Sequence, residues 1–119
     1  MIGESINTFP DQAGIASSAS GLSALALCLL DILNTSKNFK QEASSLARLG
    51  SGSASRSIYG PVVAWGEHNH HPTYSNNYAC PVDFEIHSDF AKIKNAILIV
   101  DSSKKKLSSS MGHLSLIHI

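Results

Sequence analysis

The sequence predicts a single domain of mixed α and β structure. Its 119 residues suffice for one hydrophobic core, and 43% hydrophobic with 15% charged residues is typical of a folded globular protein. Segments patterned like helices and segments patterned like strands are interleaved along the chain. This order indicates an α/β or α+β class.

The first helix is the most strongly signalled element. Residues 5–9 have the pattern of a strand end, and residues 10–16 form a loop of small residues. A helix is expected to begin at Ser17, with Ser17 or Ser18 capping its free N–H groups. Its apolar residues recur at three and four positions and give one stripe: Leu22, Leu25, Ala26, Leu29 and Leu33.

Two shorter helical segments follow. Residues 39–49 predict a second helix with Ala43, Leu46 and Ala47 facing inward and Gly50 as its natural end. Residues 53–59 are expected to add one or two further helical turns.

Strands are expected mainly in the second half. Residues 61–65 are rich in β-branched and aromatic side chains, and residues 78–83 read as a short strand that Pro81 places near an edge. Residues 66–77 are polar and turn-prone, which predicts a surface loop. The apolar run at 96–101 predicts a buried strand.

Charge and cysteine content exclude several classes of protein. Nine basic residues balance nine acidic ones, so no overall field attracts nucleic acid or an anionic membrane. Cys28 and Cys80 lack metal-ligand or redox spacing and are expected to be reduced core thiols. No signal peptide opens the chain, and its longest apolar run is too short to cross a bilayer. We therefore expect a soluble, cytoplasmic protein.

The loop before the first helix has the properties of a phosphate-binding loop. Its small residues let an anion approach the backbone, while the helix start directs N–H groups and its dipole toward that anion. The residues concerned are Pro10, Ala13, Gly14, Ala16, Ser17 and Ser18. A tight turn with serine caps explains the pattern equally well, and the Gly-Lys-Ser/Thr ending of a Walker A loop is absent.

A second anion site is predicted at "GSGSASRS", residues 50–57. Arg56 offers a planar fork of donors that suits a carboxylate or a phosphate, and the small residues around it permit close approach. An arginine at a helix start, capped by serines, is the alternative. Two such small-residue runs in one chain favour the anion site.

Two further stretches carry weaker signals. The stretch "DSSKKKLSSSMGH", residues 101–113, suits either the rim of an anion pocket or a solvated loop. His68, His70 and His71 are potential zinc or nickel ligands, but no partner stands at a recognisable spacing. No metal site is predicted.

Three of these motifs together resemble a known family. "NTFPDQAGIASSASG", "LARLGSGSASRSIYG" and "DSSKKKLSSSMGH" occur in the order and approximate spacing of mevalonate diphosphate decarboxylases, particularly bacterial ones. That family belongs to the GHMP kinase superfamily. The resemblance implies an α+β, two-layer sandwich like domain 2 of ribosomal protein S5, present here incompletely. Residues 1–113 would be the central part of the N-terminal domain.

The resemblance also implies an activity. Family members use ATP with Mg²⁺ to phosphorylate the tertiary hydroxyl of mevalonate 5-diphosphate. Loss of that phosphate and of carbon dioxide gives isopentenyl diphosphate, a precursor in isoprenoid biosynthesis. Members are often dimers, so a homodimer is expected for the complete protein.

Residue roles follow from the matching motifs. Arg56 would hold the substrate carboxylate, and Ser18 would lie near the reacting hydroxyl and the γ-phosphate. Residues 10–18 match the loop around the ATP phosphates. The remaining substrate contacts would come from Ser51, Ser53, Lys104, Lys105 and Ser109.

The chain also departs from the family pattern. The family's early lysine and its catalytic aspartate have no counterpart in a matching motif, so the 119-residue chain is expected to be inactive alone. Residues 114–119 resemble a translated sequencing adapter and are expected to be a non-native tail. A related kinase or decarboxylase acting on mevalonate or its monophosphate, and a noncatalytic nucleotide- or anion-binding module, remain alternatives.

Overall fold

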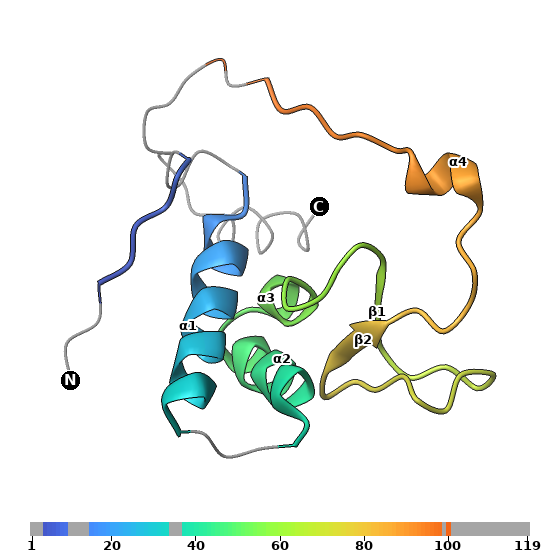
Figure 1. The fold of residues 1–119 in the computed structure, drawn as a ribbon, viewed down its shortest axis with the longest axis horizontal. Helices are drawn as coiled ribbons and strands as arrows, with labels where there is room; N and C mark the ends of the chain where they lie inside the picture. Colours follow the sequence, from blue (N-terminus) through green and yellow to red (C-terminus); the bar gives the residue numbers. More distant parts are fainter. Residues whose placement is uncertain (1–3, 10–14, 34–36, 99, 101–119) are drawn as a thin grey trace, which may run out of the picture. The chain divides into compact units, whose positions relative to one another are not determined.

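The computed structural model describes residues 4–9, 15–33, 37–98 and 100. Its elements follow in this order (Figure 1): α1 Ser17–Leu33, α2 Phe39–Gly50, α3 Gly52–Arg56, β1 Val63–Trp65, β2 Ala79–Pro81 and α4 Ser88–Ala91. Helices accompany an antiparallel pair of strands. The described part of the chain is therefore α+β, as predicted.

The chain divides into two compact units. Residues 18–96 form one unit, and residues 1–17 with 97–119 form the other. In the second unit the described backbone is irregular apart from Ser17, the first residue of α1. The strand predicted over residues 5–9 is therefore not present.

The buried strand predicted over residues 96–101 is also wrong. Residues 96–98 and 100 have no strand structure, and the side chains of Leu98 and Val100 are 88% and 90% exposed. Ile99 and Asp101 lie outside the described residues. An apolar run becomes a strand only where a neighbouring strand supplies partners for its N–H and C=O groups. Apolarity alone could not reveal whether such a partner was present.

The core of the larger unit is built from small side chains. A buried cluster joins α1, α2, α3 and the turn after α3, and it consists of Ala26, Ala43, Ala47, Ala54 and Ile58. Half-buried leucines, among them Leu22 and Leu46, pack against this cluster. Helices that meet through alanine approach closely, so substitutions with larger residues have little space. The predicted inward residues of α2 are confirmed.

The buried face of α1 differs from the predicted leucine stripe. Ala19, Ser23 and Ala26 are buried, whereas Leu25 is 52% and Leu33 60% exposed. Leucine and isoleucine occur on several sides of this helix, so periodicity does not select one face. The buried side is instead the one on which Ala26 joins the cluster of small residues from α2 and α3.

A single serine turns the chain from α2 into α3. Ser51 has an extended backbone with φ of −160°, and its N–H donates to the carbonyl of Ala47, which closes α2. Its own carbonyl accepts from the N–H groups of Ala54 and Ser55, which opens α3. The predicted end of the second helix at Gly50 is confirmed.

The two strands form a hairpin with a long connection. Val63 pairs with Pro81, Ala64 with Cys80 and Trp65 with Ala79. Both strands are shorter than predicted, and residues 66–77 lie between them as the expected loop. A short helix, α4, was not predicted; the imidazole of His87 accepts from the N–H of Asp89 at its start.

The cysteines are free but do not lie in the core. Cys28 is exposed and Cys80 is half-buried. Burial and then the charge of Asp83 raise the pKa of the Cys80 thiol, which does not favour the reactive thiolate. Among the residues that the structure describes, no helix is long and apolar enough to cross a bilayer.

Candidate functional site

The position of Arg56 depends on a buried pair of serines. Ser44 on α2 and Ser55 on α3 are both fully buried, with hydroxyl oxygens 2.9 Å apart. The Ser44 hydroxyl also lies 2.9 Å from the backbone carbonyl of Ser55, to which it donates. It accepts from the N–H of Ala79 on β2 at 2.8 Å. One side chain thus ties together the three elements around the residue that precedes Arg56.

This pattern fully uses the capacity of the Ser44 hydroxyl. A serine has one proton to donate and two lone pairs to accept with. Donation to the Ser55 carbonyl therefore requires that the Ser55 hydroxyl and the Ala79 N–H both donate to Ser44. Within the described residues, no buried side-chain nitrogen or oxygen lacks a partner.

Arg56 lines a cavity of about 440 Å³ at the end of α3. Other side chains of the lining come from β1 and from the following loop, and include Trp65, Glu67, His68 and Tyr74. Arg56 is exposed, and its guanidinium makes neither a hydrogen bond nor an ion pair among the described residues. A free guanidinium beside two aromatic rings is suited to a small anion with an apolar portion.

The Trp65 wall of the cavity is held from both sides. Its indole N–H donates to the carbonyl of Asn76 at 3.0 Å. At the other end of the indole, on its six-membered ring, a Cβ on Gly52 would lie 2.8 Å from Cη2. Only glycine lets the indole pack so closely against the start of α3. Gly66, with φ of +120°, then allows the sharp departure of the loop from β1.

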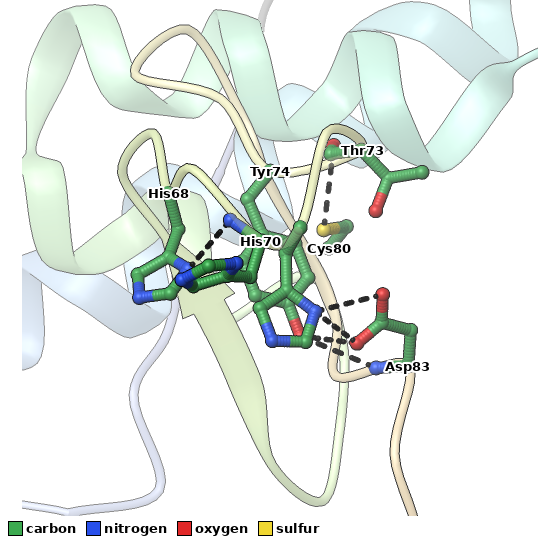
Figure 2. A network of polar contacts seen from close by, with 7 residues as sticks. His68, His70, Thr73, Tyr74, Cys80 and Asp83 are labelled. Atoms are coloured by element: carbon green, nitrogen blue, oxygen red, sulfur yellow. Dashed lines mark hydrogen bonds and ion pairs between the residues drawn. The ribbon is translucent and has the colours of Figure 1, made fainter.

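The Tyr74 wall is held by Asp83, two residues after β2 (Figure 2). The Tyr74 hydroxyl donates to Oδ1 of Asp83 at 2.8 Å and accepts from the backbone N–H of Asp83 at 3.3 Å. His71 Nδ1 lies 2.9 Å from Oδ1 and 3.1 Å from Oδ2 of the same carboxylate. The hydrogen bond from His71, and then that from Tyr74, lower the pKa of Asp83 below its ordinary value.

Ser53 lies in α3, the helix that carries Arg56, and Ser51 is the N-cap residue of that helix. Ser51 and Ser53 are half-buried, and their hydroxyl oxygens are 2.9 Å apart. Ser53 and Arg56 are three positions apart, which places them on neighbouring parts of the helix surface. Neither serine belongs to the lining of the cavity. The structure therefore brings these three residues together on α3 and its N-cap, although of the three only Arg56 lines the cavity.

The phosphate-binding loop is described only at its end. Ala16 is exposed with a positive φ of 57°, Ser17 is half-buried, and Ser18 is exposed in the first turn of α1. The other loop residues, Pro10, Ala13 and Gly14, lie outside the described residues, as do Lys104, Lys105 and Ser109. The left-handed backbone at Ala16 is uncommon for alanine and marks a sharp turn into the helix.

The histidines form an aromatic cluster. The ring centroids of His68 and His71 are 5.2 Å apart, and His71 stacks on Tyr74 at 4.8 Å. In the described part of the chain, no group of three or more His, Cys, Asp or Glu residues could hold a metal ion. His71 instead has a carboxylate partner, Asp83, twelve residues further along the chain.

Sequence reasoning missed the aromatic walls and the support behind them. Trp65 was assigned only to a strand, and Tyr74 only to a polar loop. Glycine at position 52 is the first residue of a short helix and precedes the tryptophan by thirteen positions, so no local pattern signals their contact. Asp83 likewise follows Tyr74 by nine residues without any periodic pattern. These contacts arise from hairpin pairing, which local sequence does not specify.

Comparison with known proteins places the chain in a family. The profile described as "Diphosphomevalonate decarboxylase-like N-terminal domain" matches residues 2–77. Diphosphomevalonate decarboxylase of Bos taurus is 37% identical over 106 residues, which cover 89% of this chain and 25% of that protein. The chain therefore belongs to the diphosphomevalonate decarboxylase-like family.

Further relatives agree with this assignment. The Saccharomyces cerevisiae enzyme is 37% identical over 89% of this chain and 26% of its own length, and the human enzyme is 36% identical over 91% and 25%. The chain spans about a quarter of the length of these curated relatives. No solved structure matches it.

Proposed function

We propose that the complete protein is an ATP-dependent carboxy-lyase that converts mevalonate 5-diphosphate to isopentenyl diphosphate. ATP would phosphorylate the tertiary hydroxyl, and the phosphate and carbon dioxide would then leave together, with ADP as the other product. The family membership supports this reaction, and the relatives that match carry the corresponding enzyme name.

The observation that carries the proposal is Arg56 at its cavity. A carboxylate that departs as carbon dioxide must be held in one orientation, and the guanidinium fork supplies that orientation. Trp65 and Tyr74 form apolar surfaces on which the methyl-bearing carbon skeleton could rest. Glu67 also lines the cavity, but no ion pair joins it to Arg56 in the part of the chain described.

The start of α1 supports a site for the ATP phosphates. The helix has 17 residues, so it presents several N–H groups without helical acceptors at its first turn. The turn at Ala16 and the exposed Ser18 hydroxyl suit an anion approaching that end. Ser18 would lie beside the transferred phosphoryl group. Mg²⁺ would accompany ATP through its phosphate oxygens rather than bind a separate cluster of side chains.

The remaining expectations belong to the same proposal. Ser51 and Ser53 would contact the substrate, and Lys104, Lys105 and Ser109 would complete its phosphate-binding side. The fold of the complete N-terminal domain would be the two-layer sandwich of the GHMP kinase superfamily. The complete protein would be a cytoplasmic homodimer, and residues 114–119 would not belong to the native sequence.

The test requires the complete reading frame that contains this segment. Purified protein would be supplied with ATP, Mg²⁺ and mevalonate 5-diphosphate, and release of carbon dioxide and of inorganic phosphate would be measured. We expect equal amounts of both, and no carbon dioxide without ATP. Equal turnover of mevalonate 5-phosphate would instead indicate the related decarboxylase. Absence of turnover with mevalonate, with mevalonate 5-phosphate and with mevalonate 5-diphosphate would refute the proposal.

Ser18→Ala provides the matched test of the ATP site. Since α1 begins at Ser17, Ser18 is an exposed residue of its first turn rather than its cap, and its replacement should change stability by about 0.5 kcal/mol or less. The variant should therefore stay folded while its turnover decreases strongly. Ser20→Ala, two residues further into α1 and also at an exposed position, serves as the control. Wild-type turnover of Ser18→Ala would leave Ser18 with a structural role only.

A further inference from the structure

Asp83 lies behind the Arg56 cavity and supports one of its walls. It is not among the residues that line the cavity, whereas Tyr74 and His68 are. Its carboxylate contacts both Tyr74 and His71. The centroid of the His71 ring is 4.8 Å from that of Tyr74 and 5.2 Å from that of His68. The contacts of the Asp83 side chain therefore reach the cavity through these aromatic side chains.

Tyr74 is held by contacts at its hydroxyl, its ring and its backbone N–H. Its hydroxyl is bound to a side-chain oxygen and to the backbone N–H of the same residue, so it cannot swing without breaking two hydrogen bonds. Its ring is also stacked on His71 with an interplanar angle of 12°. At the other end of the side chain, the Tyr74 N–H donates to the carbonyl of His71 at 3.0 Å.

We propose that Asp83 is a positioning residue of the Arg56 site. It holds Tyr74 and, through His71, His68 in the wall that faces Arg56, and it thereby sets the width available to the carboxylate-bearing part of the substrate. This inference rests on the proposed function for the identity of the substrate. The support itself is independent of that identity, because it is a property of the free chain.

The chemistry of Asp83 argues against a direct role in the reaction. Its carboxylate accepts hydrogen bonds from Tyr74 and His71, and it would repel the anionic substrate if it faced the cavity. Its side chain is 43% exposed, so the hydrogen bonds hold a geometry rather than add much to stability. The variants should therefore change substrate affinity more than they change folding.

The experiment uses the complete enzyme, four single variants and the double variant of Asp83→Ala with Tyr74→Phe. Asp83→Ala removes both contacts, Asp83→Asn keeps an acceptor for the Tyr74 hydroxyl, and Tyr74→Phe removes the hydroxyl itself. Asp89→Ala is the control, because Asp89 is a 77% exposed acid whose ion pairs lie on and beside α4. The KM for mevalonate 5-diphosphate, the KM for ATP, kcat and the thermal midpoint are measured for each.

We expect Asp83→Ala to raise the KM for mevalonate 5-diphosphate about tenfold, as modest misplacement of a positioning group does. The KM for ATP should not change, and Asp83→Asn should restore most of the affinity. Tyr74→Phe should show a similar rise, and the combination with Asp83→Ala should be no worse than either change alone. Additive effects, or equal rises in Asp89→Ala, would overturn the proposal.

A measurement without substrate separates this inference from the proposed reaction. In NMR spectra of the complete protein with isotopically labelled histidine, the ring resonances of His68 report the cavity wall. The His68 ring lies 5.2 Å from that of His71, tilted by 47°, and it is His71 that contacts Asp83. We expect Asp83→Ala, but not Asp89→Ala, to shift them. Unchanged His68 resonances would overturn the positioning role even in an enzyme of different specificity. Absent turnover with the shift present would refute only the proposed reaction.

Discussion

Replacing Ser44 with alanine tests the hydrogen-bonded hub beneath Arg56. The change removes the acceptor of the Ala79 N–H and the donor to the Ser55 carbonyl, and both residues are fully buried. A buried polar group left without a partner costs about 1–3 kcal/mol. Three groups are affected, because the Ser55 hydroxyl also loses its acceptor. With partial relaxation, we expect the free energy of unfolding to fall by about 2–4 kcal/mol.

Two neighbouring substitutions calibrate this value. Ser55→Ala removes one hydroxyl but leaves Ser44 bonded to the Ser55 carbonyl and to Ala79, so it should cost about 1 kcal/mol. Ser45→Ala changes the next residue of α2, which is half-buried and makes no side-chain hydrogen bond in the described residues. It should alter stability by less than about 0.5 kcal/mol. The helix propensity gained from alanine is the same at positions 44 and 45, so it cancels in their comparison.

Urea unfolding followed by far-UV circular dichroism measures all three variants. With a urea dependence of about 1–3 kcal/mol per molar, Ser44→Ala should lower the midpoint by about 1 M or more. The order of destabilisation should be Ser44→Ala, then Ser55→Ala, then Ser45→Ala. If Ser44→Ala and Ser45→Ala unfolded at the same urea concentration, the hub would not exist in solution. If Ser55→Ala were the most damaging, the assignment of Ser44 as the shared centre would be wrong.

Three further predictions concern the cavity. In the complete enzyme, Arg56→Lys should reduce turnover far more than ATP affinity, because lysine keeps the charge but loses the planar fork; collapse of ATP binding with normal saturated turnover would assign Arg56 to the nucleotide instead. Gly52→Ala should displace the indole of Trp65, because the new Cβ would lie 2.8 Å from the ring. Trp65 is the one tryptophan of the 119-residue chain, so its fluorescence emission should shift. An unchanged emission spectrum would contradict that contact. The Asp83 carboxyl should titrate below 3.8 in carbon-detected NMR. Because the pKa of Asp83 is lowered in the folded protein, its contribution to stability is present above pH 3.8 and is lost as the pH falls through the folded pKa. A titration midpoint of the Asp83 carboxyl at or above 3.8 would show that its hydrogen bonds do not form.

The helical half of the larger unit could be predicted from the sequence because its signals are local. The start at Ser17, the second helix and its end at Gly50 all follow from residues within a few positions of each other. The failures have a common physical origin. Residues 96–98 and 100 pair with no other strand in the described part of the chain, and the buried face of α1 is the one on which Ala26 joins the alanine cluster of α2 and α3. Neither condition is encoded in the segment itself.

The candidate site divides in the same way. Arg56 was identified because its chemistry and its small neighbours are adjacent in the sequence. Its cavity was not, because the walls come from β1 and the loop of a hairpin whose register brings Trp65 opposite Ala79. The motif thus predicts which group binds the anion, and the hairpin determines the surface that surrounds it.

The brevity of α3 links stability to function in this site. A helix of five residues cannot hold itself in place, since a first turn is costly to form and each further residue adds only one hydrogen bond. Its position is set from outside: Ser51 joins it to α2, Gly52 packs on Trp65, and Ser55 is bound to Ser44. Arg56 is the next residue after the last of these contacts. Because α3 is positioned by these contacts, Ser44→Ala in the complete enzyme should lower stability and should also weaken carboxylate binding under conditions where the protein is still folded. Normal affinity for mevalonate 5-diphosphate in a folded but destabilised Ser44→Ala variant would show that Arg56 is positioned by something other than this hub.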